Sequence, residues 1–156
     1  MEYCRNMEKT IIINNSFEMI ELGKKIGSQA FPNMVITMEG DLGAGKTTMT
    51  KGIALGLGIN TIVNSPTFTI LKTYQGKLNL FHLDVYRIND PYADFELEEY
   101  FESNGVCVIE WASQITPLLP DELMQIDIRD LGDNVRQVTL QSETPKYIDV
   151  ILEVTK

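Results

Sequence analysis

Apolar residues in the first third of the chain follow two different periods. Residues 9–14 and 34–39 are apolar runs of strand length, and the second is apolar enough to be buried on both faces of a sheet. Between these runs, apolar residues recur at helical spacing after a capping residue at Asn15 or Ser16. The buried stripe of this predicted helix contains Met19, Leu22, Ile26 and Ala30. The pattern therefore predicts a strand, a helix and a second strand.

The middle of the chain continues this alternation of strands and helices. A helix is predicted from residue 46 to about residue 57, and residues 67–75 and 78–86 are predicted to form a hairpin. An acidic helix is predicted over residues 92–101, and a fully apolar strand over residues 105–111. This order is typical of a sheet that carries helices on its faces.

The last third of the chain is richer in predicted strands. Pro117 and Pro120 indicate a loop, after which residues 122–130, 135–143 and 147–154 are each predicted to be a strand. Together with the earlier elements, this pattern predicts a three-layer α/β domain with a mixed β-sheet flanked by helices.

Length and composition agree with one domain. The chain has 156 residues, of which 44% are hydrophobic and 22% charged, and this is enough to bury a core. We expect residues 1–156 to form a single domain, with residues 1–8 as a candidate flexible N-terminal extension. The apolar runs are too short to cross a bilayer, and residues 1–10 lack the apolar core of a signal peptide. The expected location is the cytoplasm.

The charge balance argues against one class of function. The chain has 13 basic and 22 acidic residues, a net charge of −9, and its Lys and Arg residues form no cluster. Such a chain repels a phosphate backbone over most of its surface, so tight independent binding of nucleic acid is not expected. Cys4 and Cys107 are too few for a four-ligand zinc site, and Cys107 is expected to be a buried apolar residue.

A glycine-rich segment, GDLGAGKTT at residues 40–48, joins the second predicted strand to the second predicted helix and matches the phosphate-binding pattern G-x-x-x-x-G-K-[ST]. The glycines let the backbone curl with its N–H groups toward an anion, and the positive end of the helix points at the same place. The Lys46 ammonium can reach β- and γ-phosphates, and the Thr47 hydroxyl can ligate Mg²⁺. The predicted phosphate-binding residues are Asp41, Leu42, Gly43, Ala44, Gly45, Lys46, Thr47 and Thr48. The segment and its context predict a P-loop NTPase-like domain.

Two acidic residues at strand ends are candidates for the other half of this site. Asp84 ends the run LFHLD, and Glu110 ends the run GVCVIE. An unpaired carboxylate after a buried strand is costly, and a P-loop enzyme needs an acid there to hold Mg²⁺ or orient water. Asp84 and Glu110 are therefore predicted as catalytic and metal-binding residues beside Thr47. The sequence leaves open which of the two touches the metal.

Three further residues accompany these acids. Thr67 lies in the tetrapeptide SPTF, in the region where P-loop switch proteins sense the γ-phosphate. Trp111 follows Glu110 and is a candidate nucleotide contact, with packing in the core or at its rim as the alternative. His82, the only histidine, lies two residues before Asp84 and faces the same side of its strand, and a structural role is the simpler interpretation.

Three blocks in this order resemble the bacterial TsaE (YjeE) family. They are GDLGAGKTT at residues 40–48, SPTF at residues 65–68 with HLDVYRI at residues 82–88, and IEW at residues 109–111. Many families share the phosphate loop, whereas H-x-D-x-Y-R together with E-W in a chain of this size is specific. The resemblance runs from the first predicted strand through residue 123.

This resemblance implies a Mg²⁺-dependent ATPase needed to form N6-threonylcarbamoyladenosine at position 37 of tRNAs that read ANN codons. Such a subunit acts with the TsaD–TsaB complex, meets tRNA only through that complex, and hydrolyses ATP weakly when alone. The resemblance implies catalytic roles for Lys46, Asp84 and Glu110, and a place for Asp84 and Glu110 at the metal. It also places Thr67 in a switch element and Trp111 beside Glu110.

Two other functions stay open from the residues alone. A small-molecule P-loop kinase would need a lid with several arginines, and residues 112–122 contain no Arg or Lys, which argues against it. A nucleotide-responsive binding module would bind ATP and a partner without turnover. The presence of both Asp84 and Glu110 favours hydrolysis over that alternative.

Overall fold

The computed structural model describes residues 6–64, 71–86 and 97–156, and within these ranges helices separate most of the strands along the chain. The strands are β1 (Met7–Ile13), β2 (Met34–Glu39), β3 (Leu71–Tyr74), β4 (Leu80–Asp84), β5 (Val106–Glu110), β6 (Met124–Gly132) and β7 (Val135–Ser142). The helices are α1 (Ser16–Ser28), α2 (Lys46–Gly56), α3 (Leu97–Phe101), the 3-10 helix η1 (Ala112–Leu118) and α4 (Pro145–Val154). In the described part of the chain, no helix is long and apolar enough to span a membrane.

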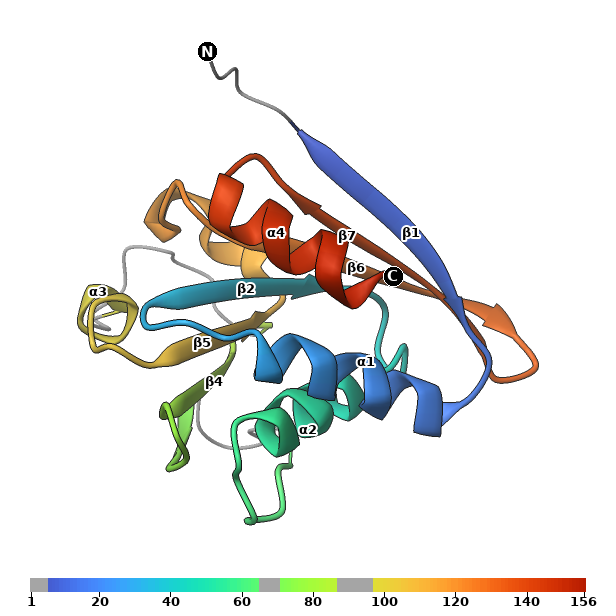
Figure 1. The fold of residues 1–156 in the computed structure, drawn as a ribbon, viewed down its shortest axis with the longest axis horizontal. Helices are drawn as coiled ribbons and strands as arrows, with labels where there is room; N and C mark the ends of the chain where they lie inside the picture. Colours follow the sequence, from blue (N-terminus) through green and yellow to red (C-terminus); the bar gives the residue numbers. More distant parts are fainter. Residues whose placement is uncertain (1–5, 65–70, 87–96) are drawn as a thin grey trace.

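The strands form one mixed sheet in the order β1-β7-β6-β2-β5-β4-β3 (Figure 1). The central strands β6, β2, β5 and β4 are parallel to one another, and antiparallel strands lie at both edges. Because parallel strands share one direction, β2, β4 and β5 end at the same edge of the sheet. Their last residues there are Glu39, Asp84 and Glu110. The topology thus brings the two predicted acids to one place.

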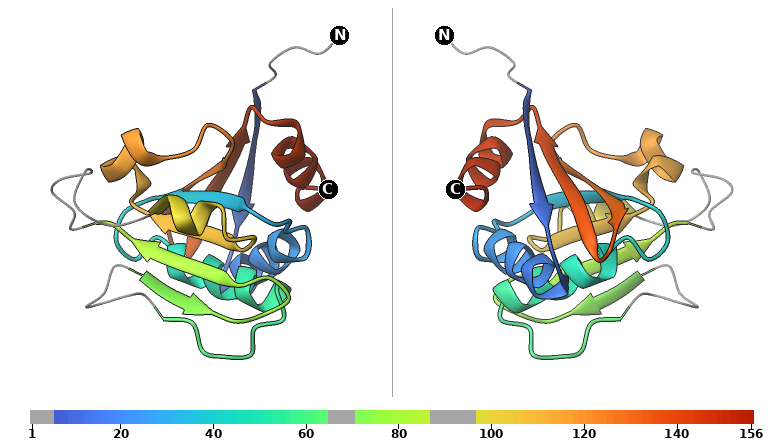
Figure 2. Two further views of the ribbon diagram at one scale, coloured as in Figure 1. Left: turned by 90° about the vertical axis from the view of Figure 1, so that its left-hand side faces the viewer. Right: turned by 90° about the vertical axis from the view of Figure 1, so that its right-hand side faces the viewer.

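Two cores lie on opposite faces of this sheet, because successive residues of a strand point to opposite sides. One core contains Met34, Ile36 and Met38 of β2, together with residues of α1, α2 and α4. The other contains Val35 of β2, together with residues of α3 and η1. Figure 2 shows α3 and η1 on the side of the sheet away from α1 and α4. Helices on both faces confirm the predicted three-layer α/β architecture with a mixed sheet.

Helix α1 shows how local sequence sets an element's start. Asn15 is its N-cap, and the Asn15 side chain accepts a hydrogen bond from the backbone N–H of Glu18 at 2.9 Å, so the first of the two predicted caps is the correct one. The residues predicted for its buried stripe are buried, except Ala30, which lies beyond the end of the helix and is half-buried. Capping and helical spacing were therefore sufficient to place this helix.

The third strand predicted for the last third of the chain is wrong. Residues 147–154 belong to helix α4, which begins at Pro145. Its buried residues are Tyr147, Val150, Ile151 and Val154, which share one helix face. A proline in the first turn is favourable for a helix, because that position needs no hydrogen-bonded N–H.

Smaller corrections concern two other segments. β1 begins at Met7, so residues 7 and 8 belong to the sheet and not to a flexible extension. Residues 112–118 form η1, with Pro117 inside it, in place of the predicted loop. Parts of three predictions, at residues 1–5, 67–70 and 92–96, lie outside the described residues.

Candidate active site

The loop between β2 and α2 has the backbone of an anion-binding site. Residues 34–38 of β2 are all buried and fix one end of the loop. Gly45 is the N-cap of α2 and has a φ of 119°, a left-handed conformation that glycine adopts without a steric penalty. Because Gly45 has no side chain to cap α2, the first amides of the helix and the positive end of its dipole stay available to a ligand. A phosphate group suits such a helix terminus.

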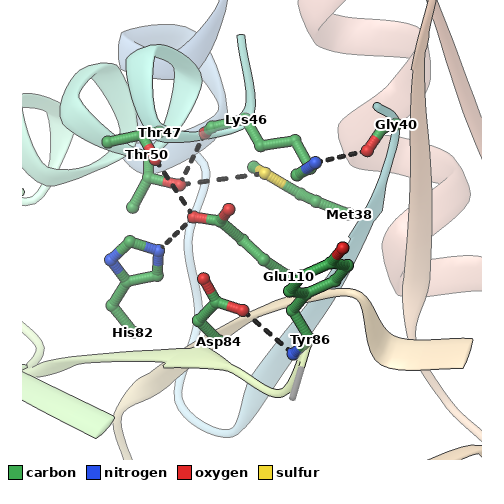
Figure 3. Close-up of polar contacts among 9 residues, drawn as sticks. All are labelled: Met38, Gly40, Lys46, Thr47, Thr50, His82, Asp84, Tyr86 and Glu110. Atoms are coloured by element: carbon green, nitrogen blue, oxygen red, sulfur yellow. Dashed lines mark hydrogen bonds and ion pairs between the residues drawn. The ribbon is translucent and has the colours of Figure 1, made fainter. Parts of the chain in front are cut away.

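Lys46, the first residue of α2, lies beside this loop and is only 5% exposed. Its Nζ donates hydrogen bonds to the carbonyl oxygens of Gly40 and Asp41, the second at 3.2 Å, as Figure 3 shows for Gly40. Burial lowers the pKa of Lys46 from its ordinary value of 10.5, and the carboxylates of Glu110 and Asp84 are the main groups that oppose this shift. The ammonium group therefore has neutral partners that a charged phosphate can replace.

Glu110 and Asp84 lie side by side at the ends of β5 and β4, where they are register partners. Glu110 is 3% exposed, and its Oε2 lies 2.5 Å from His82 Nε2 and 3.4 Å from the hydroxyl of Thr47 (Figure 3). Asp84 is half-buried, and its Oδ1 accepts a hydrogen bond from the backbone N–H of Tyr86 at 3.0 Å. The two acids thus lie together beside the first turn of α2.

Trp111 covers one side of Lys46. Its ring centroid is 4.0 Å from Lys46 Nζ and 4.6 Å from the ring centroid of Tyr86, which is 43% exposed. Its backbone is left-handed, with a φ of 63°, and its N–H donates to the Met38 carbonyl at 3.0 Å. Such a conformation is uncommon for a bulky residue, and strained backbone of this kind clusters at functional sites.

A recess that sequence reasoning missed adjoins the loop. Its volume is about 370 Å³, and Gly43, Ala44, Gly45 and Thr48 form the loop side of it. The remaining polar or charged lining residues come from the β1–α1 turn and the β6–β7 hairpin, and they are Asn14, Asn15, Ser16, Asp133, Asn134 and Arg136.

Arg136 fixes the hairpin to the loop. Its Nε donates to the Ala44 carbonyl at 2.8 Å, and its Nη1 pairs with Asp130 Oδ1 at 3.0 Å. The recess exists because β1 pairs with β7, with Ile13 opposite Arg136. Local sequence patterns do not predict this pairing, because β1 and β7 are far apart in the chain.

Comparison with known families adds the deciding observation. The family model described as "Threonylcarbamoyl adenosine biosynthesis protein TsaE" matches residues 13–138, which include the loop, both acids and Arg136. This chain belongs to the TsaE family.

Individual TsaE relatives agree with the family model. The Bacillus subtilis (strain 168) tRNA threonylcarbamoyladenosine biosynthesis protein TsaE is 51% identical over 134 residues, which cover 85% of each chain. The protein of the same name from Treponema pallidum is 41% identical over 120 residues, covering 76% of this chain and 89% of the relative. A crystal structure of Bacillus subtilis YdiB superposes with a TM-score of 0.86 at 41% identity, covering 97% of this chain and 96% of YdiB.

The predicted site residues of this TsaE-family chain do not all lie equally close together. Lys46, Thr47, Glu110 and Trp111 form one contacting group. Leu42, at the outside of the loop, is 73% exposed. Thr67 lies outside the described residues, so its predicted switch role stays a prediction.

The donor set at this TsaE site suits Mg²⁺ bound together with phosphates. Among residues 6–64, 71–86 and 97–156, no group of three or more His, Cys, Asp and Glu side chains could hold a metal by itself. Mg²⁺ is usually bound by one or two carboxylates together with waters and substrate phosphates. The Thr47 hydroxyl and the carboxylates of Asp84 and Glu110 offer hard oxygen ligands of that kind.

Proposed function

We propose that this TsaE-family chain binds ATP together with Mg²⁺ and hydrolyses the ATP. One observation carries the proposal: a lysine, a hydroxyl and two carboxylates gather around the N-terminus of α2 at one edge of the sheet. A phosphate loop explains the lysine and the hydroxyl, and phosphoryl transfer explains why acids lie beside them.

The triphosphate would lie along the loop between β2 and α2. Lys46 would exchange its bonds to the carbonyl oxygens of Gly40 and Asp41 for bonds to phosphate oxygens. A charged acceptor makes the stronger hydrogen bond, so the exchange is favourable. Burial disfavours the charged form of Lys46 and lowers its pKa. A bound polyphosphate would raise the pKa of Lys46 again, because its negative charge favours the ammonium form.

The hydroxyl of Thr47 and the carboxylates of Asp84 and Glu110 would hold Mg²⁺. When bound, Mg²⁺ neutralises charge that develops on the phosphate oxygens. Asp84 is the more exposed of the two acids, and one of its oxygens is fixed by the Tyr86 N–H. Asp84 is therefore also placed to orient a water molecule.

The adenosine would lie in the recess that adjoins the loop. The volume of about 370 Å³ falls within the usual range of about 300–1,000 Å³ for small-molecule sites. Gly43 and Gly45 line both the recess and the phosphate loop, so base and phosphates can be bound by one continuous surface. Asn14 and Asn134 supply amide groups for the base or the ribose.

We further propose that the chain serves the formation of threonylcarbamoyladenosine at position 37 of tRNA, as a partner of the TsaD–TsaB complex. Support comes from the sequence blocks and from the names of the relatives. The net charge of −9 makes the chain a poor binder of tRNA by itself, so tRNA would be met through the complex. A partner that completes the site can contribute roughly 10³–10⁵ in rate, which would explain weak hydrolysis by the chain alone.

The test is Mg²⁺-dependent ATP hydrolysis by the purified chain alone and after addition of TsaD and TsaB. We expect slow hydrolysis alone and strong stimulation by the pair, and loss of the stimulated rate in Glu110→Gln. Fast hydrolysis alone, or no response to the pair, would contradict the partner-dependent function. Phosphate transfer to a panel of nucleosides would instead indicate a small-molecule kinase, and ATP binding without turnover in the complex would indicate a binding module.

A further inference from the structure

His82 has a closer relation to the site than its place in the sequence suggests. Its side chain is fully buried, and its Nε2 lies 2.5 Å from Glu110 Oε2. β4 and β5 are adjacent parallel strands, and His82 is two residues before Asp84, so the strands carry both side chains toward Glu110. The imidazole therefore contacts one proposed metal ligand and shares a strand face with the other.

The contacts of Glu110 are unevenly divided between its two oxygens. His82 Nε2 and the Thr47 hydroxyl both approach Oε2, at 2.5 Å and 3.4 Å. In Figure 3 the other carboxylate oxygen is turned toward the side of the site that carries Lys46. A carboxylate with one oxygen held by a buried donor has lost most of its freedom to rotate, so its second oxygen is presented in one direction.

We propose that His82 is a positioning residue, whose Nε2–H holds Glu110 Oε2 and so directs the Glu110 carboxylate toward Mg²⁺ and the phosphates. This inference rests on the proposed ATPase function. A carboxylate that binds a metal only accepts hydrogen bonds, so this role requires the proton of the imidazole to be on Nε2. Partners of this kind orient the groups that bind a metal, and their loss typically costs about 10- to 100-fold in metal affinity.

The surroundings of His82 fit a positioning role better than a purely structural one, in which both ring nitrogens would be hydrogen-bonded. Its Nδ1 is buried and has no hydrogen-bond partner within the described residues. An apolar side chain of similar size would fill the same space without leaving Nδ1 unpaired. The contact that requires an imidazole at this position is therefore the one between Nε2 and Glu110.

The first test reads the proton directly. Because His82 is the only histidine, long-range ¹H–¹⁵N spectra of the labelled, unmodified chain contain a single imidazole. We expect a proton on Nε2, with the ¹⁵N shift of Nε2 changing in Glu110→Gln. A neutral ring protonated only on Nδ1 would overturn the proposal, and this measurement needs neither nucleotide nor activity.

The second test compares two substitutions of matched size. Gln in place of His82 can keep an N–H donor near the position of Nε2, whereas Met fills a similar volume without a donor. The readout is the Mg²⁺ concentration that half-saturates tight binding of a fluorescent ADP. We expect His82→Met to raise this concentration about tenfold or more and His82→Gln to stay within about threefold of the parent. Affinity for ADP in EDTA should be unchanged in both.

The outcomes separate this proposal from the one on which it rests. Equal losses in both variants, or a loss confined to thermal stability and to affinity in EDTA, would show a merely structural histidine and overturn the proposal. If neither variant folds, the imidazole spectrum of the unmodified chain still decides it. If the unmodified chain hydrolyses no ATP with Mg²⁺ present and TsaD and TsaB added, the proposed ATPase function fails, whatever the imidazole spectrum shows.

Discussion

At the scale of the residue, Lys46 lies between the loop at residues 40–48, to which it donates hydrogen bonds, and the carboxylates of Glu110 and Asp84. We expect Lys46→Ala to weaken ADP binding by about 1.5–3 kcal/mol, or roughly 10- to 150-fold, because it removes a charged donor to phosphate. The measurement is calorimetric titration with ADP in EDTA, so that the metal ligands do not contribute. Lys51→Ala, at an exposed position of the same helix, is the matched control and should bind normally. Normal binding by Lys46→Ala would mean that the loop does not hold the phosphates.

Cys107 carries a prediction about pH. Burial raises the pKa of its thiol from 9.0 to about 12, so the folded chain keeps it protonated. Thiol reagents should leave it unmodified at pH 8 and modify it after unfolding, in a Cys4→Ser variant where it is the only thiol. The stabilisation linked to this shift is present below pH 9.0 and is lost as the pH rises toward about 12.

Labelling of Cys107 is followed by mass spectrometry, with and without denaturant. Rapid modification of the folded chain at pH 8 would contradict the buried environment in β5. Its replacement by alanine is the control, because the folded and unfolded chains should then behave alike toward the reagent.

The sequence alone singled out the loop at residues 40–48 and the two acids as candidates, because each has a local signal. Lys46 follows a glycine pattern, and Asp84 and Glu110 each end an apolar run. The contact between His82 and Glu110 needs the pairing of β4 with β5, and the recess near Arg136 needs the pairing of β1 with β7. Neither pairing leaves a mark in the local sequence, which is why both features were missed.

At the scale of the element, the packing of α1 against α2 depends on glycines that face one another. A Cβ on Gly52 of α2 would overlap the Ile20 carbonyl oxygen and lie 2.9 Å from the Cα of Gly23 in α1. Gly27 and Gly56 repeat the arrangement one turn further along. The helix that carries Lys46 is therefore held in place by a close backbone contact.

We expect Gly52→Ala to destabilise the fold by roughly 1–3 kcal/mol, because overpacking against backbone atoms outweighs the better helix propensity of alanine. The measurement is the free energy of unfolding in urea, together with ADP affinity, which should fall as α2 moves. Lys51→Ala, one residue away on the exposed side, should change stability by less than about 0.5 kcal/mol. Unchanged or increased stability of Gly52→Ala would show that the two helices can separate at no cost.

The error at α4 shows the limit of propensity at this scale. Its β-branched residues favour a strand, and strict alternation would even give that strand one apolar face, with Ile148, Val150, Leu152 and Val154. The helix instead buries Tyr147, Val150, Ile151 and Val154. Both periods are therefore present in the sequence, and the packing of α4 against β7, α1 and β1 decided between them.

At the scale of the whole molecule, the candidate site lies at the edge of the sheet where several parallel strands end. β2 leads into the phosphate loop, while β4 and β5 supply the acids. The buried strands β2 and β5 were predictable from their apolar runs, but the strand order was not, because it is set by long-range pairing. The antiparallel strands β7 and β1 then add the wall of the recess.

The charge of the whole molecule gives the last prediction. With a net charge of −9, the chain alone should not bind tRNA at about 0.15 M salt, so any dissociation constant should be weaker than about 10⁻⁴ M. Fluorescence anisotropy with labelled tRNA measures this for the chain alone and with TsaD and TsaB added. We expect tRNA binding only when the pair is present. Salt-dependent binding by the chain alone would instead require a local basic surface strong enough to overcome the overall repulsion, and would mean that tRNA is not met solely through the complex.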